Sequence, residues 1–352
     1  MKKKTILGFL ILLFSLVLLI TGCSKSEAPA ATSTTPASTP AVKEVSTPDK
    51  QADTAKYTDG IYFAMDDAYA SSGWKETATL VVEGGKIVSA DWNGVNVNGG
   101  ADKKTFDKAG KYNMVKFGKA QADWAVQAAK AEAYLISTQD PAKISYKDSE
   151  GHSDDIAGVS IHVSPFFKLA AKALANGPVG RGSLTDGAYF AIQDDYASGW
   201  KDFVSFTVIN GRIAGVDWSG VNTAGEDKKA YDKAGKYNMV KFGKAQAEWY
   251  EQATKAEDYL VANQDFKKLT YKDEEGHTDD IAGVSIHVSG FAKLVDNALA
   301  AGPVAIGSYA DGTYFASDDD FGTNGWKETI SLFVNNGNIV NVNWSGGEQE
   351  WG

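Results

Sequence analysis

The most constraining feature of this sequence is that it repeats itself. The segment Gly151–Ser164 recurs almost letter for letter as Gly276–Ser289, and the block Asp107–Ala122 recurs unchanged as Asp232–Ala247. Self-similarity at a fixed spacing indicates a fold assembled from equivalent units instead of one large core. A polar segment that occurs twice also predicts a functional site that occurs twice.

Three places in the chain carry the start of the repeated unit. Each reads Asp-Gly-x-Tyr-Phe-Ala: Asp59–Ala64, Asp186–Ala191 and Asp311–Ala316. The third copy reaches Gly352 without a counterpart of the Gly-Val-Ser segment. We therefore predict two complete domains, repeat 1 at 57–180 and repeat 2 at 184–304, and a partial third repeat, repeat 3, at 308–352.

The first part of each unit reads as a β-meander. In repeat 1, Thr77–Val82 and Ile87–Trp92 are rich in β-branched residues and flank Gly84-Gly85. Repeats 2 and 3 have Asn210-Gly211 and Asn336-Gly337 at the same point. These dipeptides favour tight hairpin turns because such turns need positive φ.

Two helices are expected to follow the meander. Apolar residues at helical spacing place one stripe on the first helix: Phe117, Ala120, Trp124, Ala128, Ala131 and Leu135. The second helix is expected to begin with Ser164 as N-cap and Pro165 at its first position, and to end at 176–178, Asn-Gly-Pro. The predicted fold class is α+β, with tandem units that each hold a twisted antiparallel sheet and two main helices.

Composition and charge exclude several functions. The chain has 352 residues, of which 43% are hydrophobic, so it can form packed cores. Its formal net charge of −10 argues against a nucleic-acid partner, because binding to phosphates requires a basic surface. Cys23 is the only cysteine, which excludes a disulfide framework, a CxxC redox pair and a thiolate metal site.

The N-terminus carries a targeting signal. A basic start, Met1–Lys4, precedes the apolar run Ile6–Ile20, and the run leads into Ile-Thr-Gly-Cys23, which resembles a bacterial lipobox. The resemblance implies a signal peptide at 1–22 and acylation of Cys23, which would anchor the chain in membrane lipid. An uncleaved anchor helix is the alternative. Residues 23–56 are rich in Ala, Ser, Thr, Pro and Lys and are predicted to be a lipidated flexible linker.

The repeated polar segment resembles a known modification motif. It reads Asp154-Asp-Ile-Ala-Gly-Val-Ser160 and again Asp279-Asp-Ile-Ala-Gly-Val-Ser285. It is similar to the flavinylation motif of FMN-binding domains, in which Asp, two variable residues, Ser or Thr, Gly and Ala precede the Thr or Ser that carries FMN. The segment departs from that pattern by placing alanine before the glycine and valine after it.

The resemblance assigns roles to these residues. It implies two covalent FMN groups per chain, in phosphoester linkage to Ser160 and Ser285. It also implies that Asp154 and Asp279 assist a Mg-dependent flavin transferase that uses FAD as donor, by binding Mg²⁺ in the complex with that enzyme.

The residues around each serine fit such a linkage. Gly158 and Gly283 let the backbone come close to a phosphate because they have no Cβ. If the chain after the glycine is extended, Ser160 and His162 lie on one face and the intervening apolar residues on the other. His162 and His287 could then hydrogen-bond the phosphate or the flavin edge.

Other interpretations of the same residues remain open. The Gly-Val-Ser segment could be a plain turn into the following helix. His152 and His162 could form a metal site with Asp154 and Asp155, but no third ligand stands at helical spacing, so we predict no metal. Three tryptophans could stack on the flavin or pack in the core: Trp74, Trp92 and Trp124.

With its lipobox and linker, the chain is similar to the flavinylated lipoproteins of Gram-positive extracellular electron transfer, the pheromone-lipoprotein type. This implies a redox carrier that is not an enzyme, lipid-anchored on the extracellular face of the cell membrane. Its expected donor is a membrane quinol-linked dehydrogenase, and its acceptor is ferric iron or soluble flavin. The alternatives are a repeat-type surface lipoprotein that binds a ligand or cell-wall component without flavin, and a metal-dependent surface hydrolase.

Overall fold

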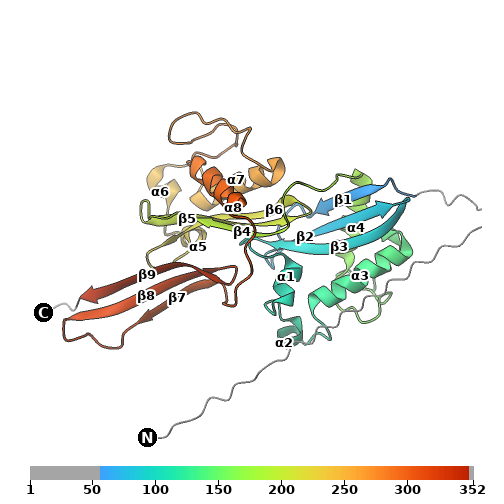
Figure 1. Ribbon diagram of the computed structural model, residues 1–352, viewed down its shortest axis with the longest axis horizontal. Coiled ribbons are helices and arrows are strands. Elements are labelled where there is room, and N and C mark those ends of the chain that lie inside the picture. Colours follow the sequence, from blue (N-terminus) through green and yellow to red (C-terminus); the bar gives the residue numbers. More distant parts are fainter. Residues whose placement is uncertain (1–55, 349–352) are drawn as a thin grey trace, which may run out of the picture. The chain divides into compact units, whose positions relative to one another are not determined.

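The described residues fold into three sheets with the same layout. A computed structural model describes residues 56–348, so the predicted signal peptide, Cys23 and nearly all of the linker lie outside it. The first sheet consists of β1 (Gly60–Met65), β2 (Trp74–Glu83) and β3 (Lys86–Asn96), the second of β4 (Gly187–Ile192), β5 (Trp200–Ile209) and β6 (Arg212–Asn222), and the third of β7 (Gly312–Ser317), β8 (Trp326–Asn335) and β9 (Asn338–Glu348). Every sheet is an antiparallel meander in chain order (Figure 1), as the repeated sequence predicts.

The hairpin predictions are confirmed. Asn210 and Gly211 have φ of 53° and 69°, and Asn336 and Gly337 have φ of 49° and 72°. In repeat 1 two glycines occupy the same turn, both with positive φ. Positive φ at both central positions is the condition for the tight turn whose twist matches the flanking strands.

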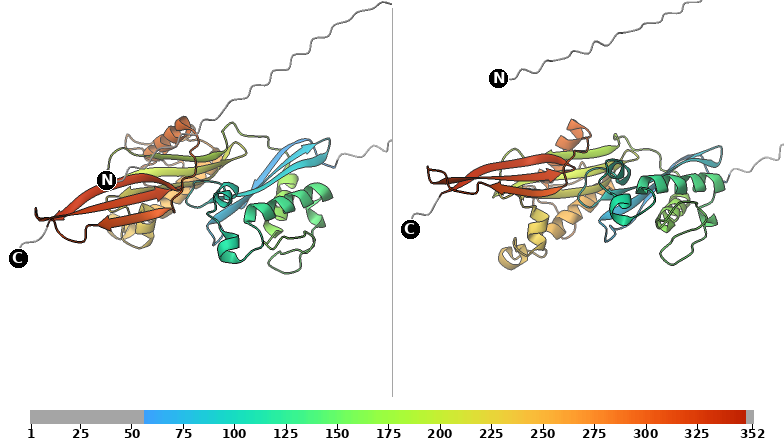
Figure 2. Two further views of the ribbon diagram at one scale, coloured as in Figure 1. Left: turned by 60° about the horizontal axis from the view of Figure 1, so that its bottom comes forward. Right: turned by 90° about the horizontal axis from the view of Figure 1, so that it is seen from below.

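Helices follow the first two sheets. Repeat 1 contains α1 (Lys103–Lys108), α2 (Met114–Gly118), α3 (Trp124–Thr138), the 3₁₀ turn η1 (Pro141–Lys143) and α4 (Ser164–Asn176). Repeat 2 contains α5 (Lys228–Lys233), α6 (Met239–Gly243), α7 (Trp249–Asn263) and α8 (Ser289–Ala301). The fold class is α+β, as predicted (Figure 2). Among residues 56–348, no helix combines the length and the apolar character needed to cross a membrane.

Each of the two helical repeats has its own core, centred on a tryptophan of the third strand. Trp92 is 1% exposed, stacks on Phe166 at 5.3 Å between ring centroids and meets Trp124 edge-on at 5.1 Å. In repeat 2, Trp218 stacks on Phe291 at 4.6 Å between ring centroids and meets Trp249 edge-on at 5.3 Å. Burial of such large rings against α4 and α8 accounts for much of the packing that holds these helices on their sheets.

The long helical stripe is confirmed only in part. Trp124, Ala128, Ala131 and Leu135 are buried in α3. Phe117 is not on the stripe, because it lies in the separate five-residue helix α2 and is 73% exposed. Ala120 is not on it either, because it lies between α2 and α3. The residues that flank α2 adopt left-handed φ, which interrupts the helix.

The start of α4 also corrects a prediction. Val163 is the N-cap, and no side chain caps this helix, so Ser164 is the first helical residue and not the cap. The predicted end is confirmed, since α4 stops at Asn176 and Gly177 follows with φ of 83°. A glycine with positive φ after the last turn is a usual helix stop.

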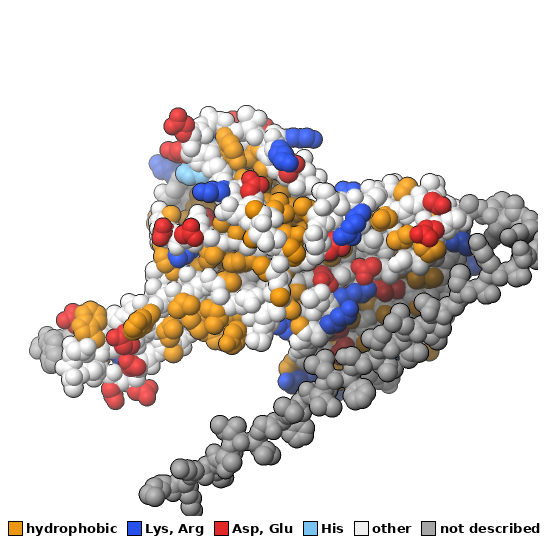
Figure 3. Space-filling model, in the orientation of Figure 1, with side chains coloured by type: hydrophobic (Ala, Val, Ile, Leu, Met, Phe, Trp, Pro, Cys, Tyr) orange, Lys and Arg blue, Asp and Glu red, His pale blue; other side chains and the backbone are white. Residues whose placement is uncertain are grey.

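The third sheet lacks a helical cover within the described residues. Phe315 is 68% exposed and Trp344 is 76% exposed, whereas the equivalent Trp92 and Trp218 are buried. Figure 3 shows apolar side chains gathered on the surface of β7–β9. The helices of repeats 1 and 2 are therefore what covers the tryptophan-bearing face of each sheet.

Candidate functional site

Ser160 and Ser285 lie on an exposed stretch just before α4 and α8. The stretch belongs to no strand, bends at Ile161 and reaches Val163 in a helical backbone conformation, but the burial of its side chains alternates as predicted. Ile161 and Val163 are buried at 8% and 0% exposure, whereas Ser160 and His162 are exposed. The buried apolar residues fix the backbone against the core, and the serine and histidine side chains are left exposed.

A buried glutamine holds each serine. The backbone N–H of Ser160 donates to Gln127 Oε1 at 2.7 Å, and the Ser160 hydroxyl donates to the same oxygen at 3.2 Å. Gln252 holds Ser285 in the same way, at 2.7 and 3.1 Å. Gln127 is 1% exposed and is itself fixed by a hydrogen bond to the Ala122 carbonyl. The serine hydroxyl oxygen therefore stands at a defined position on the surface.

The motif glycine has a structural role in addition to the predicted one. Gly158 has φ of 70°, and a Cβ there would lie 2.5 Å from Lys130 Nζ. Lys130 Nζ donates to the Gly158 carbonyl at 3.1 Å, and Lys255 does the same for Gly283 at 3.3 Å. The glycine is needed for a left-handed turn against a lysine, and that turn brings an ammonium group to the chain two residues before the serine.

The motif aspartates point into solvent. The Asp154 side chain is 80% exposed and pairs with Lys147 at 3.0 Å, and Asp279 pairs with Lys272 at the same distance. The second aspartate of the pair, Asp155, accepts the Ser145 N–H instead. Asp154 and Asp279 are thus accessible to a partner protein, as a role in a complex requires.

The histidines meet carboxylates that sequence reasoning did not select. His152 and His162 lie together with Glu150, and His277 and His287 with Glu275, each group offering ligand atoms within 4.8 Å of one another. Asp154 and Asp155, the predicted alternatives, are not part of the first group.

In repeat 2 the serine opens onto an aromatic cavity. The cavity has a volume of about 380 Å³, and Ser285 and His287 form part of its wall. Its other walls include four aromatic rings: Trp200, Trp218, Tyr237 and Trp249. This volume lies within the usual range of small-molecule sites, roughly 300–1,000 Å³, and apolar rings with a few polar groups are their typical lining.

A buried lysine lies against these rings. Lys228 is 6% exposed, its ammonium lies 4.1 Å from the ring centroid of Trp249, and it pairs with Asp202 at 3.0 Å. Lys103 and Glu76 form the same pair in repeat 1, at 2.9 Å. The Lys228 ammonium is thus stabilised by the Asp202 carboxylate and by the face of the Trp249 ring. A buried cation needs such partners because it has lost its contacts with water.

One polar group in this cavity has no partner. Trp218 is 2% exposed, and its indole Nε1–H donates to no acceptor within residues 56–348. In repeat 1 the equivalent Trp92 Nε1 donates to Glu76 Oε2 at 2.6 Å. Buried donors are almost always satisfied, so this indole N–H, whose nitrogen has almost no accessible surface, is an exception among the buried polar groups of the described residues.

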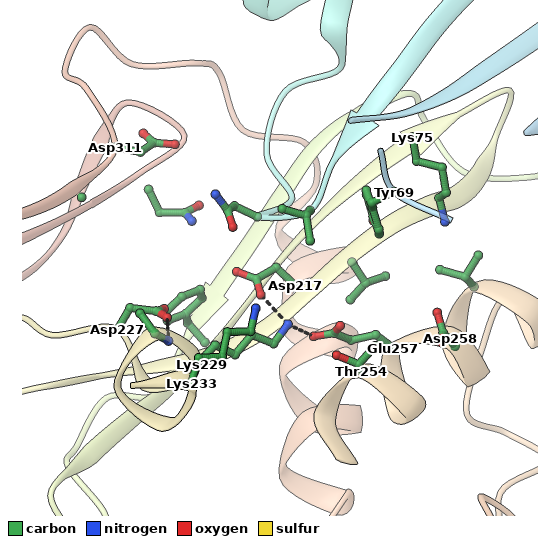
Figure 4. Close-up of a pocket in the computed structure, with 18 of the residues that line it drawn as sticks. Tyr69, Lys75, Asp217, Asp227, Lys229, Lys233, Thr254, Glu257, Asp258 and Asp311 are labelled. Atoms are coloured by element: carbon green, nitrogen blue, oxygen red, sulfur yellow. Dashed lines mark hydrogen bonds and ion pairs between the residues drawn. The ribbon is translucent and has the colours of Figure 1, made fainter. Parts of the chain in front are cut away.

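A second, larger cavity is lined by residues of all three repeats and has a volume of about 530 Å³. Figure 4 shows Lys229 between Asp217 and Glu257, at 2.7 and 2.5 Å. Burial raises the pKa of the Glu257 carboxyl to about 7, and the Lys229 ammonium opposes the rise. In repeat 1, Lys104 pairs in the same way with Asp91 and Glu132. These charges therefore balance one another in both repeats.

Comparisons with known proteins name no activity. No family model matches the chain, and no curated protein matches it. A solution NMR structure of a Clostridium thermocellum protein is 53% identical and covers 34% of this chain and 90% of its own, with a TM-score of 0.28. A crystal structure of a Clostridium perfringens protein is 25% identical and covers 34% and 88%, with a TM-score of 0.27.

Proposed function

We propose that the chain is a membrane-anchored extracellular electron carrier that holds two FMN groups, in phosphoester linkage to Ser160 and Ser285. The observation that carries the proposal is the cavity of repeat 2, where the motif serine stands at the wall of an aromatic site with an unpaired buried donor. FMN would supply one- and two-electron transfer when bound. The chain's residues would hold it, orient it and keep it from diffusing away.

The groups around the serine suit a phosphoester. Gln127 and Gln252 fix the serine oxygen on the surface, where a flavin transferase can reach it. Lys130 and Lys255 bring an ammonium group near the attachment point, and a cation beside a phosphate is favourable.

The groups inside the cavity suit a planar polar ring. The rings of Trp200, Tyr237 and Trp249 give the cavity an aromatic wall, and Trp218 Nε1–H is a buried donor behind it that has no acceptor among the described residues. Lys228 adds a fixed positive charge in the wall, and Asp202 balances it. These features fit a conjugated heterocycle with carbonyl acceptors better than they fit a saturated or anionic sugar.

Attachment is tested by mass and by two matched serine pairs. We expect the chain produced with its flavin transferase to gain two FMN groups less water. Ser160→Ala should remove one group and Ser285→Ala the other, while the neighbouring Ser164→Ala and Ser289→Ala retain both. Peptide mapping of flavin to Ser164 or Ser289, or covalent flavin in the Ser160→Ala/Ser285→Ala variant, would contradict the assignment.

Anchoring is tested separately at Cys23. We expect Cys23→Ala to release the protein from membranes without changing its flavin content, because two acyl chains are enough for stable anchoring. Unchanged membrane retention would favour an uncleaved anchor helix. Electron delivery from a quinol-linked dehydrogenase to ferric iron or soluble flavin can then be measured with the anchored and released forms.

A further inference from the structure

All four histidines of the chain stand in two clusters of identical composition. The first contains Glu150, His152 and His162, and the second contains Glu275, His277 and His287. The two imidazole rings are 4.2 Å apart between centroids in both clusters and meet edge to face. Neither the flavin attachment nor the core packing described above uses this grouping.

The fold builds the cluster by joining two loops through one glycine. The Gly151 carbonyl accepts the N–H of Val163 at 2.8 Å and the N–H of Ser164 at 3.3 Å. Gly151 has φ of 91°, and a Cβ at this position would overlap the Ser164 side chain. This junction fixes the residue after Gly151, His152, beside the residue before Val163, His162.

A carboxylate orients the first histidine. His152 Nδ1 lies 2.7 Å from Asp148 Oδ2, and His277 Nδ1 lies 2.6 Å from Asp273 Oδ2. A histidine that donates its Nδ1–H to a carboxylate keeps a lone pair on Nε2, and this is the usual support of a metal-binding histidine.

The second histidine and the glutamate are spaced as ligands. His162 Nε2 and Glu150 Oε2 are 3.4 Å apart, and His287 Nε2 and Glu275 Oε2 are also 3.4 Å apart. This exceeds the usual hydrogen-bond length of about 2.7–3.2 Å. Two ligands bound tetrahedrally at about 2.0–2.2 Å from zinc are about 3.4 Å apart.

We propose that each cluster binds one divalent transition-metal ion through two histidines and one glutamate. Imidazole with a single carboxylate suits ions such as Zn²⁺ and Fe²⁺ rather than Mg²⁺ or Ca²⁺. Three protein ligands leave a coordination position for water or another ligand. In repeat 2 His287 also lines the aromatic cavity, so the ion would stand at the edge of that cavity. The proposal does not depend on flavin.

Zn²⁺ and Co²⁺ are the probes for this site. The full chain is produced without a flavin transferase, purified without a polyhistidine tag and stripped with chelator. Calorimetric titration should show two Zn²⁺ ions per chain, and Co²⁺ should give visible absorption typical of nitrogen and oxygen ligands. His162→Ala should abolish one site and His287→Ala the other, with circular dichroism showing that both variants fold.

Two adjacent glutamates provide a matched control. Glu275→Gln should weaken the repeat 2 site at least tenfold, while Glu274→Gln, which changes an exposed neighbour, should leave it unchanged. Asp273→Asn should weaken it by about 10–100-fold, as loss of a histidine's supporting carboxylate does. The Glu variants keep the test valid if a histidine variant misfolds.

The outcomes separate this proposal from the flavin one. The Ser160→Ala/Ser285→Ala variant should still bind two Zn²⁺ ions, even if the serines never carry flavin. Absence of Zn²⁺ uptake by the unmodified chain, or equal uptake by the His162→Ala/His287→Ala variant, would overturn the metal site. In that event His162 and Glu150 are an ordinary surface ion pair.

Discussion

Beside the central tryptophan, repeat 1 has a glutamate where repeat 2 has an aspartate, which is shorter by one methylene group. Glu76 reaches the Trp92 indole N–H in repeat 1, and Glu328 reaches the Trp344 indole N–H in repeat 3, at 2.6 and 2.7 Å. Repeat 2 has Asp202 at this position, and the Trp218 N–H is left without an acceptor. Asp202 keeps its bond to the buried lysine, so the shortening affects only the bond to the indole.

This difference leaves repeat 2 with a buried donor that repeats 1 and 3 satisfy with a glutamate. A satisfied buried donor contributes to the fold, whereas an orphaned one costs stability until a ligand satisfies it. The loop beside it changes too: repeat 2 places Ser198, with φ of 50°, in the cavity wall. The two repeats therefore hold their motif serines in the same way and differ in the hydrogen bonding of the tryptophan beside them.

The largest expected contrast lies in the buried ion trios behind the tryptophans. Lys229→Met should lower the free energy of unfolding by about 3–5 kcal/mol, because it leaves two buried carboxylates without their cation. Lys104→Met should cost clearly less, since the Asp91 side chain is 42% exposed and the Asp217 side chain is 7% exposed. Guanidinium unfolding of the flavin-free chain measures both, and equal losses would contradict the contrast.

The next contrast tests the effect of the glutamate-to-aspartate difference on stability. Glu76→Asp should destabilise repeat 1 by about 1–3 kcal/mol, by orphaning the Trp92 N–H as in repeat 2. Asp202→Glu should stabilise repeat 2 by roughly 1 kcal/mol and reduce the cavity. Thermal and denaturant unfolding report both effects. Glu83→Asp, the same change at an exposed position, serves as control and should stay within about 0.5 kcal/mol.

The smallest contrast concerns the starts of α3 and α7. Glu248 and Glu251 form a reciprocal capping box on α7, whereas Asp123 makes no side-chain cap on α3. Glu251→Ala should cost roughly 0.5–1 kcal/mol. Its counterpart Val126→Ala should cost less than about 0.5 kcal/mol, since Val126 is 53% exposed. Equal effects in denaturant unfolding would show that the box adds nothing.

Features governed by neighbouring residues could be predicted from the sequence. The Asn210-Gly211 turn and the Gly177 helix stop follow from local φ preferences, and both are confirmed. The alternation of Ser160 and His162 follows from the apolar residues between and after them. The prediction for Phe117 was wrong because helical spacing does not reveal the left-handed residues that separate α2 from α3.

Features that join distant residues could not be predicted. Gln127 stands 33 positions before Ser160, and nothing in its local pattern marks a serine contact. Its spacing to Lys130, repeated as Gln252 and Lys255, is a signal that a comparison of the repeats would have found. Glu150 joined the histidines because the Gly151 junction folds the loop back, whereas sequence proximity pointed to the wrong aspartates.

The exposed helix α2 has a consequence for how the repeats have diverged. Its surroundings, Asp107–Ala122, are identical in the second copy, yet only Asp107 among them is buried. The core has drifted instead, with Leu80 replaced by Phe206 and Ala78 by Val204 at matching strand positions. A protein that binds this surface on repeat 1 would therefore meet the same side chains again on repeat 2.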